Sequence, residues 1–169
     1  IDEIPDPNKI NEFNTLNKYA CFLQKNFQSK INLLNISEKY WMGTKIIQKK
    51  YLKSPQWLRE LKFKKRPFWR IDKFRLNNII LEGGWHFCNL KSPEQLLYKY
   101  KNLCETNDPY HFKEKIDPKY LTVDSIKNFI SSSKDLIGRD HNYEKIEIDE
   151  KLPKYLRDNI KKFKDWIIF

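Results

Sequence analysis

The sequence is poor in the residues that hold small folds together covalently or through metal ions. It has three cysteines in 169 residues, and they are far apart and form no CxxC pair. An odd number at this spacing excludes the usual ligand pattern of a structural zinc site and argues against a disulfide framework. We therefore expect a reducing compartment, which is the cytoplasm.

Long hydrophobic runs are also missing. No apolar stretch approaches the roughly 18 residues that a membrane-spanning helix needs, and no signal-peptide pattern is present. The sequence contains no internal repeats and no low-complexity linkers. Its length suits one domain of ordinary size, so we expect a single domain over residues 1–169.

Positive charge is in excess, with 33 Lys and Arg residues against 22 Asp and Glu residues and a net charge of +11. The lysines are spread along the whole chain, with only short clusters such as residues 62–66 (KFKKR). Such a charge suits nucleic acid, phosphorylated substrates or an anionic membrane surface, so it decides little by itself. An alternative function is binding of single-stranded nucleic acid, with the basic and aromatic segment 57–75 as the stacking groove.

Hydrophobic periodicity indicates a chain in which helices and strands interleave. Helical spacing or helix-start signals predict helices over 8–24, 54–61, 92–104, 122–131 and from Pro153 onward. Runs rich in β-formers, most with alternating polarity, predict strands over 26–36, 40–52, 79–81 and 144–149. This order predicts the α/β class, with a mixed sheet and flanking helices.

The segment 81–87 (LEGGWHF) follows a predicted buried strand and has two of the four glycines in the sequence. A glycine pair lets the backbone turn sharply or come very close to a ligand. Three side chains that can hold a sugar or a metal crowd around it: Glu82, Trp85 and His86. The alternative is a tight turn whose tryptophan and histidine pack into the core.

Two further segments carry candidate ligand-binding groups. Asp2 and Glu3 precede Pro5 in what reads as a rigid loop, where two adjacent carboxylates can ligate a hard divalent cation. The alternative is a solvated acidic turn. In the segment 40–52, Gly43 interrupts a predicted strand and marks another place where the backbone could approach a ligand.

Four sequence blocks together resemble glycosyltransferase family 17. They are DEIP at 2–5, WMGTK at 41–45, GGWHF at 83–87 and PKYLRDNIKKFKDWI at 153–167, and the similarity runs over nearly the whole chain. Animal members of the family are β-1,4-mannosyl-glycoprotein β-1,4-N-acetylglucosaminyltransferases. The resemblance implies an inverting transferase with the GT-A nucleotide-sugar fold, a Mn²⁺ (or Mg²⁺) ion, UDP-N-acetylglucosamine as donor and a glycan as acceptor.

The family extends its Asp-x-Asp metal motif as Asp-x-Asp-Glu-Ile-Pro, and this sequence begins at the x. The resemblance therefore implies the C-terminal portion of a GT-A enzyme, without the upstream half that binds the nucleotide. An inactive carbohydrate-binding remnant of a transferase is an alternative on the same grounds. The resemblance implies no nucleic-acid partner, while the basic surface leaves peripheral membrane contact open.

By its match to the second Asp of the motif, Asp2 would be a metal ligand. In such an enzyme Glu3 would bind through water or hold the loop. His86 is the candidate for contacting the metal or diphosphate, with a packed or hydrogen-bonded histidine as the alternative. The expected catalytic base is Glu82, for which a surface residue closing the strand is the alternative. The expected substrate-binding residues are Trp41, Gly43, Thr44, Gly83, Gly84, Trp85 and, as a diphosphate clamp, Arg70.

Overall fold

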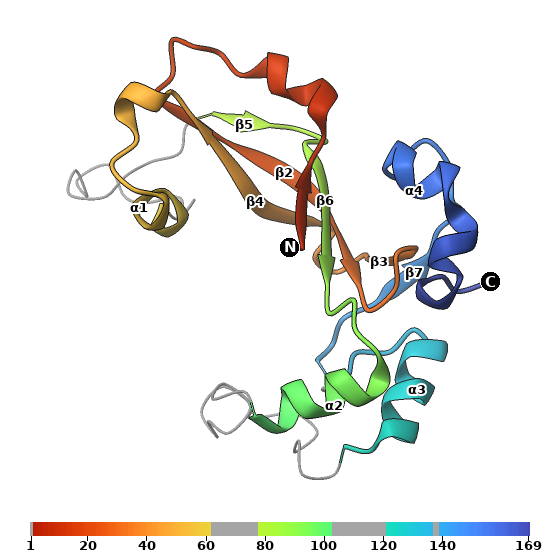
Figure 1. Ribbon diagram of the computed structural model, residues 1–169. Coiled ribbons are helices and arrows are strands. Elements are labelled where there is room, and N and C mark those ends of the chain that lie inside the picture. Colours follow the sequence, from red (N-terminus) through yellow and green to blue (C-terminus); the bar gives the residue numbers. More distant parts are fainter. Residues whose placement is uncertain (1, 62–77, 103–120, 137–138) are drawn as a thin grey trace. The chain divides into compact units, whose positions relative to one another are not determined.

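A computed structural model describes residues 2–61, 78–102, 121–136 and 139–169 (Figure 1). The strands are β1 (Glu3–Pro5), β2 (Tyr19–Gln28), β3 (Leu33–Asn35), β4 (Tyr40–Ile47), β5 (Ile79–Ile80), β6 (Gly84–Cys88) and β7 (Tyr143–Lys145). The α-helices are α1 (Pro55–Glu60), α2 (Pro93–Asn102), α3 (Val123–Ser131) and α4 (Lys154–Asp158). Three 3₁₀ helices in the described residues cover Pro7–Glu12, Lys49–Tyr51 and Ile160–Trp166. The chain is thus α/β, with a mixed sheet and flanking helices, as predicted.

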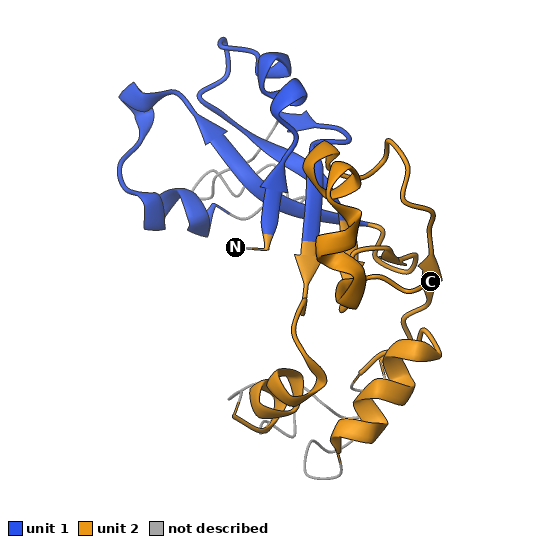
Figure 2. Cartoon of the chain, turned by 45° about the vertical axis from the view of Figure 1, so that its right-hand side comes forward, with its two compact units in different colours: residues 1, 3–25, 40–86 blue, residues 2, 26–39, 87–169 orange. Residues whose placement is uncertain are grey.

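The chain forms two compact units, shown in different colours in Figure 2. Unit 1 comprises residues 3–25 and 40–86, and unit 2 comprises residues 26–39 and 87–169 together with Asp2. The strands β2 and β6 each begin in unit 1 and end in unit 2. None of the described helices is long and apolar enough to cross a membrane.

In unit 1, β2 is the central strand, with β4 antiparallel and β5 parallel to it. Ala20 and Phe22 of β2 pack with Ile80, while the neighbouring Cys21 packs with Leu61. Both faces of this half of the strand are therefore covered, which gives a nearly continuous apolar run. The helix predicted over 8–24 is wrong for this reason: a run buried on both sides fits a helical stripe as well as a strand, and sheet pairing decides.

The pairing of β4 with β2 contains a β-bulge. Cys21 is opposite Lys45, but Leu23 is opposite Met42, so two residues of β4 face one residue of β2 between these pairs. The two bulged residues are Gly43 and Thr44. An extra residue reverses the alternation of side chains along the strand, so that positions three apart point to the same face.

The strand β1 lies antiparallel to β6 and forms one end of the strand order. The sequence predicts a loop for the acidic segment from Asp2 to Pro7, because it contains two prolines. Residues 3–5 form a strand instead. Pro5 is tolerated there because it is the last residue of a strand at one end of the strand order, where a missing N–H is acceptable.

In unit 2, α2 and α3 pack through a shared core of Leu96, Tyr100, Leu121, Ile126, Ile130 and Leu136. Both helix starts are confirmed. Ser92 Oγ accepts from Gln95 N at 3.3 Å and Gln95 Oε1 accepts from Ser92 N at 3.2 Å, which completes the predicted capping box. The helix predicted after Pro153 is shorter than expected, because α4 ends at Asp158 and a 3₁₀ helix follows.

Candidate functional site

A group of five side chains in unit 1, called here the Glu3 cluster, gathers around one carboxylate. Glu3 on β1 lies directly opposite His86 on β6, so both side chains leave the same face of the sheet. Glu3 Oε1 accepts a hydrogen bond from Trp41 Nε1 at 2.9 Å, and Oε2 accepts from Thr44 Oγ1 at 3.5 Å. The cluster consists of Glu3, Gln24, Trp41, Thr44 and His86.

The β4 bulge is what brings Trp41 and Thr44 to the same carboxylate. In a regular strand, residues three positions apart point to opposite faces. Here both donate to Glu3, because the extra residue at Gly43–Thr44 restores Thr44 to the face of Trp41. Bulges that re-aim a side chain in this way are common next to functional sites.

Gln24 forms the buried base of the cluster. It has no exposed surface, and its Nε2 donates to Thr44 Oγ1 at 3.4 Å while its Oε1 accepts from Thr44 N at 3.3 Å. Thr44 then donates onward to Glu3. The chain of donors therefore runs from the core to the carboxylate, which acts as acceptor at both oxygens.

Trp41 is the part of the cluster that solvent reaches. Its ring stacks on the buried imidazole of His86, with 4.7 Å between ring centroids and 17° between planes. Even so, 42% of the Trp41 surface is exposed. The cluster thus presents an indole that is fixed by a ring contact and a hydrogen bond, beside a carboxylate that accepts hydrogen bonds.

Glu82, the expected base, belongs to a different group of side chains. Its Oε1 accepts from Tyr40 Oη at 2.7 Å and its Oε2 pairs with Lys25 Nζ at 2.9 Å. Lys25 and Tyr40 are register partners one position from Gln24 and Trp41, so they leave the opposite face of the sheet. The hydrogen bond to Glu82, together with burial, raises the pKa of the Tyr40 hydroxyl. The structure does not bring Glu82 into the Glu3 cluster.

The Glu82 backbone has φ of +49°, which is a left-handed conformation that costs a residue other than glycine about 1–3 kcal/mol. Asparagine tolerates this region better than glutamate or glutamine. We therefore expect Glu82→Asn to be more stable to urea than Glu82→Gln by about 0.5 kcal/mol, although both lose the exposed ion pair to Lys25. Equal urea midpoints for the two variants would show that the turn carries no backbone strain.

The glycines 83 and 84 lie close to other parts of the protein. A Cβ on Gly83 would lie 2.7 Å from Phe22 Cβ. A Cβ on Gly84, whose φ is +131°, would collide with the carbonyl oxygen of Ile4 and lie 2.7 Å from Asp6 N. The close backbone approach predicted from this glycine pair is therefore that of β1 and β2. Trp85 follows on β6 opposite Ile4, so it leaves the face opposite to His86.

The other predicted site residues have separate positions. Asp2 is exposed and belongs to unit 2, where its carbonyl accepts from Phe87 N at 2.7 Å. Gly43 lies in the bulge, where a Cβ would collide with the Gln24 carboxamide. Arg70 lies outside the described residues.

In the part of the chain that the structure describes, no group of three or more His, Cys, Asp and Glu side chains could hold a metal ion. Glu3 and His86 nevertheless place one carboxylate and one imidazole on the same face of the sheet. Stacking on Trp41 uses the face of the His86 ring, whereas coordination uses a ring nitrogen at the edge. A carboxylate is the ligand type that suits Mn²⁺, whereas an imidazole is more typical of Zn, Cu, Fe and Ni, so the pair supplies two possible donors but not a complete site.

Three polar residues of these groups escaped prediction: Gln24, Lys25 and Tyr40. The signal for Gln24 is its place as a polar residue directly after the apolar run 19–23 (YACFL), in a segment for which the sequence predicts a helix and the structure has a strand. A buried amide in a strand needs hydrogen-bond partners, and the partner of Gln24 is Thr44 of the Glu3 cluster. Lys25 and Tyr40 had no signal, because only the β2–β4 register brings them to Glu82.

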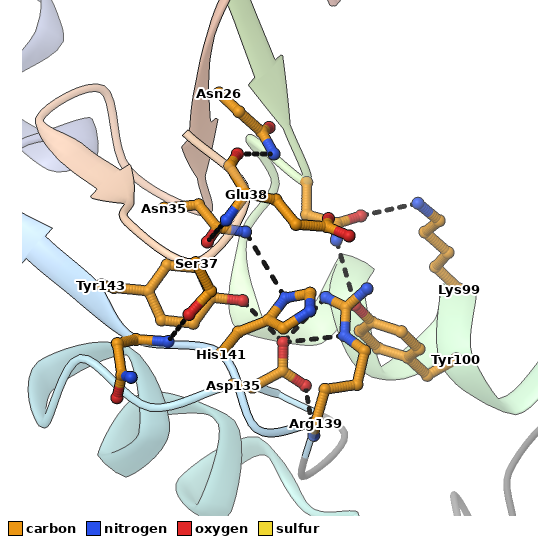
Figure 3. Close-up of polar contacts among 12 residues, drawn as sticks. Asn26, Asn35, Ser37, Glu38, Lys99, Tyr100, Asp135, Arg139, His141 and Tyr143 are labelled. Atoms are coloured by element: carbon orange, nitrogen blue, oxygen red, sulfur yellow. Dashed lines mark hydrogen bonds and ion pairs between the residues drawn. The ribbon is translucent and has the colours of Figure 1, made fainter. Parts of the chain in front are cut away.

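Unit 2 contains its own polar network, centred on a buried carboxylate (Figure 3). Asp135 Oδ2 accepts from Arg139 Nη2 at 2.7 Å, Arg139 Nε at 3.0 Å and Tyr143 Oη at 2.6 Å, and Oδ1 accepts from Arg139 N at 3.0 Å. Burial disfavours the charged form, but the hydrogen bonds from Arg139 and Tyr143 outweigh it and lower the pKa of Asp135. The network ties the segment after α3 to β7 and is a structural ion pair.

Comparison with known proteins gives no match: no family model, no curated protein and no solved structure resembles this chain significantly.

Proposed function

We propose that the chain binds a sugar at the Glu3 cluster as part of an inverting, metal-dependent glycosyltransferase. One observation carries this proposal. Three of the four sequence blocks that resemble family 17 converge on the cluster, although they lie far apart in the sequence: block 2–5 supplies Glu3, block 41–45 supplies Trp41 and Thr44, and block 83–87 supplies His86. Segments that converge in this way are expected if the blocks share one site.

The chemistry of the cluster suits a sugar. The exposed indole of Trp41 offers an apolar face of fixed orientation, and an aromatic ring of this kind can cover the C–H face of a hexose. Glu3 beside it is an acceptor for sugar hydroxyls. The mixed sheet with flanking helices is compatible with the GT-A class, which we assign as part of this proposal.

In the transfer reaction, a hydroxyl of the acceptor glycan attacks the anomeric carbon of N-acetylglucosamine or a related sugar. The new C–O bond forms as the bond to the nucleoside diphosphate breaks, and the hydroxyl proton passes to a general base. A bound Mn²⁺ would neutralise the leaving diphosphate as a Lewis acid. Glu3 and His86 are the residues of the cluster that would hold it. Glu82 lies with Lys25 and Tyr40 on the opposite face, so we do not assign it as base for a sugar bound at Trp41.

The test is to titrate UDP-N-acetylglucosamine and free N-acetylglucosamine with and without Mn²⁺, by calorimetry and ligand-observed NMR. We expect Trp41→Ala to weaken sugar binding about tenfold, because aromatic stacking contributes about 0.5–1.5 kcal/mol. Tyr98→Ala is the matched control, since this ring in unit 2 is 73% exposed and lies on α2. It should bind as tightly as the native chain.

The outcomes separate the forms of this proposal. Mn²⁺-dependent hydrolysis or transfer from the nucleotide sugar supports a transferase. Sugar binding that Trp41→Ala weakens, without turnover, would indicate a carbohydrate-binding remnant. A folded native chain that binds neither the sugar nor the nucleotide sugar would refute the proposal.

A further inference from the structure

One surface of unit 1 is strongly basic and is built by two sequence segments. Residues 14–18 and 45–59 contain six Lys and Arg residues and no Asp or Glu. Gln48 joins them, because its Nε2 donates to the carbonyls of Thr15 at 2.5 Å and Asn17 at 2.9 Å. We call the exposed side chains of this surface the basic loop patch: Leu16, Lys18, Lys49, Lys50, Leu52 and Lys53.

The patch exposes two leucines among its lysines. Leu16 is 92% exposed, and the hydrogen bond from its N–H to Asn14 Oδ1 at 2.9 Å fixes the local turn. Leu52 is 41% exposed. A single exposed leucine is ordinary. Here Leu16 lies two residues before Lys18, and Lys18 contacts the Tyr51 ring of the second segment, so both segments contribute to one surface.

The aromatic rings of this surface are contacted by its own lysines. Lys18 Nζ and Lys50 Nζ lie 5.3 and 5.0 Å from the centroid of the Tyr51 ring, and Lys53 Nζ lies 5.6 Å from that of Trp57. These are cation–π distances. A stacking groove for single-stranded nucleic acid needs open ring faces, so the described part of this surface favours another anionic partner.

We propose that the basic loop patch docks unit 1 on an anionic lipid surface. The four lysines are placed to attract acidic headgroups, and Leu16 and Leu52 are placed to enter the boundary between headgroups and acyl chains. Tyr51, which is 37% exposed between them, is of the residue type enriched at that depth. Nucleic acid offers the same negative charge but no apolar layer for the two leucines. The inference stands independently of sugar binding at the Glu3 cluster.

The experiment measures partitioning of the full chain onto vesicles of phosphatidylcholine, with and without phosphatidylserine. We expect binding only to the mixed vesicles, and strong weakening by salt. Lys49→Ala with Lys50→Ala should weaken partitioning about 25-fold, because each lysine near such a surface contributes about a fivefold factor. Leu16→Ala should weaken it about tenfold, because it removes an apolar side chain that would enter the membrane.

The control is a double substitution of equal charge in unit 2, Lys154→Ala with Lys161→Ala, which should bind like the native chain. Circular dichroism confirms that each variant is folded. An equal loss in the control would show that only total charge matters, which overturns the proposal. Absence of vesicle binding, with salt-sensitive binding to a single-stranded oligonucleotide, would assign the patch to nucleic acid instead.

Discussion

Replacing Gly84 with alanine is expected to destabilise the protein by about 4 kcal/mol. Its φ of +131° is strained for any residue with a side chain, which costs about 1–3 kcal/mol. The new Cβ would also collide with the Ile4 carbonyl, and overpacking adds a similar amount. The obstacle is backbone, so β1 must move away from β6. Urea unfolding followed by tryptophan fluorescence measures the loss.

Gly43→Ala is the matched control for this prediction. Its Cβ would meet the end of the Gln24 side chain, which can rotate, and its φ is not positive. We expect a cost of about 1 kcal/mol, together with weaker sugar binding, because the two hydrogen bonds between Gln24 and Thr44 would break. Equal stability losses for the two variants would mean that the β1–β6 contact is not the cause.

The second large effect is expected from Asp135→Asn, which should destabilise unit 2 by about 3 kcal/mol at neutral pH. Removing one partner of a buried ion pair leaves the other charge without compensation. We take the lower end of the usual range, because the Arg139 side chain is 33% exposed. Hydrogen exchange of the α3 and β7 amides reports the effect in this unit directly.

The contribution of Asp135 to stability is expected to fall in acid, because its pKa is lowered by folding. The pKa of Asp135 is lower in the folded protein than in the unfolded chain, so its stabilisation is fully present above the unfolded value, about 3.9. It is lost as the pH falls through the folded value. The stability gap between the native chain and Asp135→Asn should therefore be constant from pH 7 to about pH 5 and close below about pH 4.

Asp149→Asn provides the control for this titration. Asp149 pairs with Lys151 at 3.0 Å at the surface, and its backbone and side-chain hydrogen bonds with Lys151 also lower its pKa. Exposed pairs of this kind contribute little to stability. We expect almost no change in the urea midpoint. A gap at Asp135 that did not narrow in acid would show that packing, rather than charge, causes the loss.

Local signals in the sequence were enough to predict the helices α2 and α3 of unit 2. Ser92 and Gln95 form a capping box whose bonds depend on neighbouring residues alone, and the apolar spacing of Ile126 and Ile130 matches the buried face of α3. The α/β class followed from the same alternation of elements. Four of the five residues of the Glu3 cluster are among the candidates named from the sequence, namely Glu3, Trp41, Thr44 and His86.

The arrangement of those candidates could not be predicted, because it depends on pairing between distant segments. No local pattern shows that Gly43 and Thr44 form a bulge opposite Phe22, or that Glu3 is in register with His86. Without the register, Glu82 and His86 appeared to share a site, since they are four residues apart. The turn and the alternation of β6 instead send them to different neighbours.

The backbone pairing of β1 with β6 has a consequence for how this protein can evolve. Glu3 is held opposite His86 by the main-chain pairing of β1 with β6, and this pairing requires a residue without a side chain at Gly84. The support of the site and its recognition groups are therefore encoded at different positions. Trp41, exposed at the surface, can be replaced without disturbing this backbone pairing, whereas Gly84 must stay a glycine.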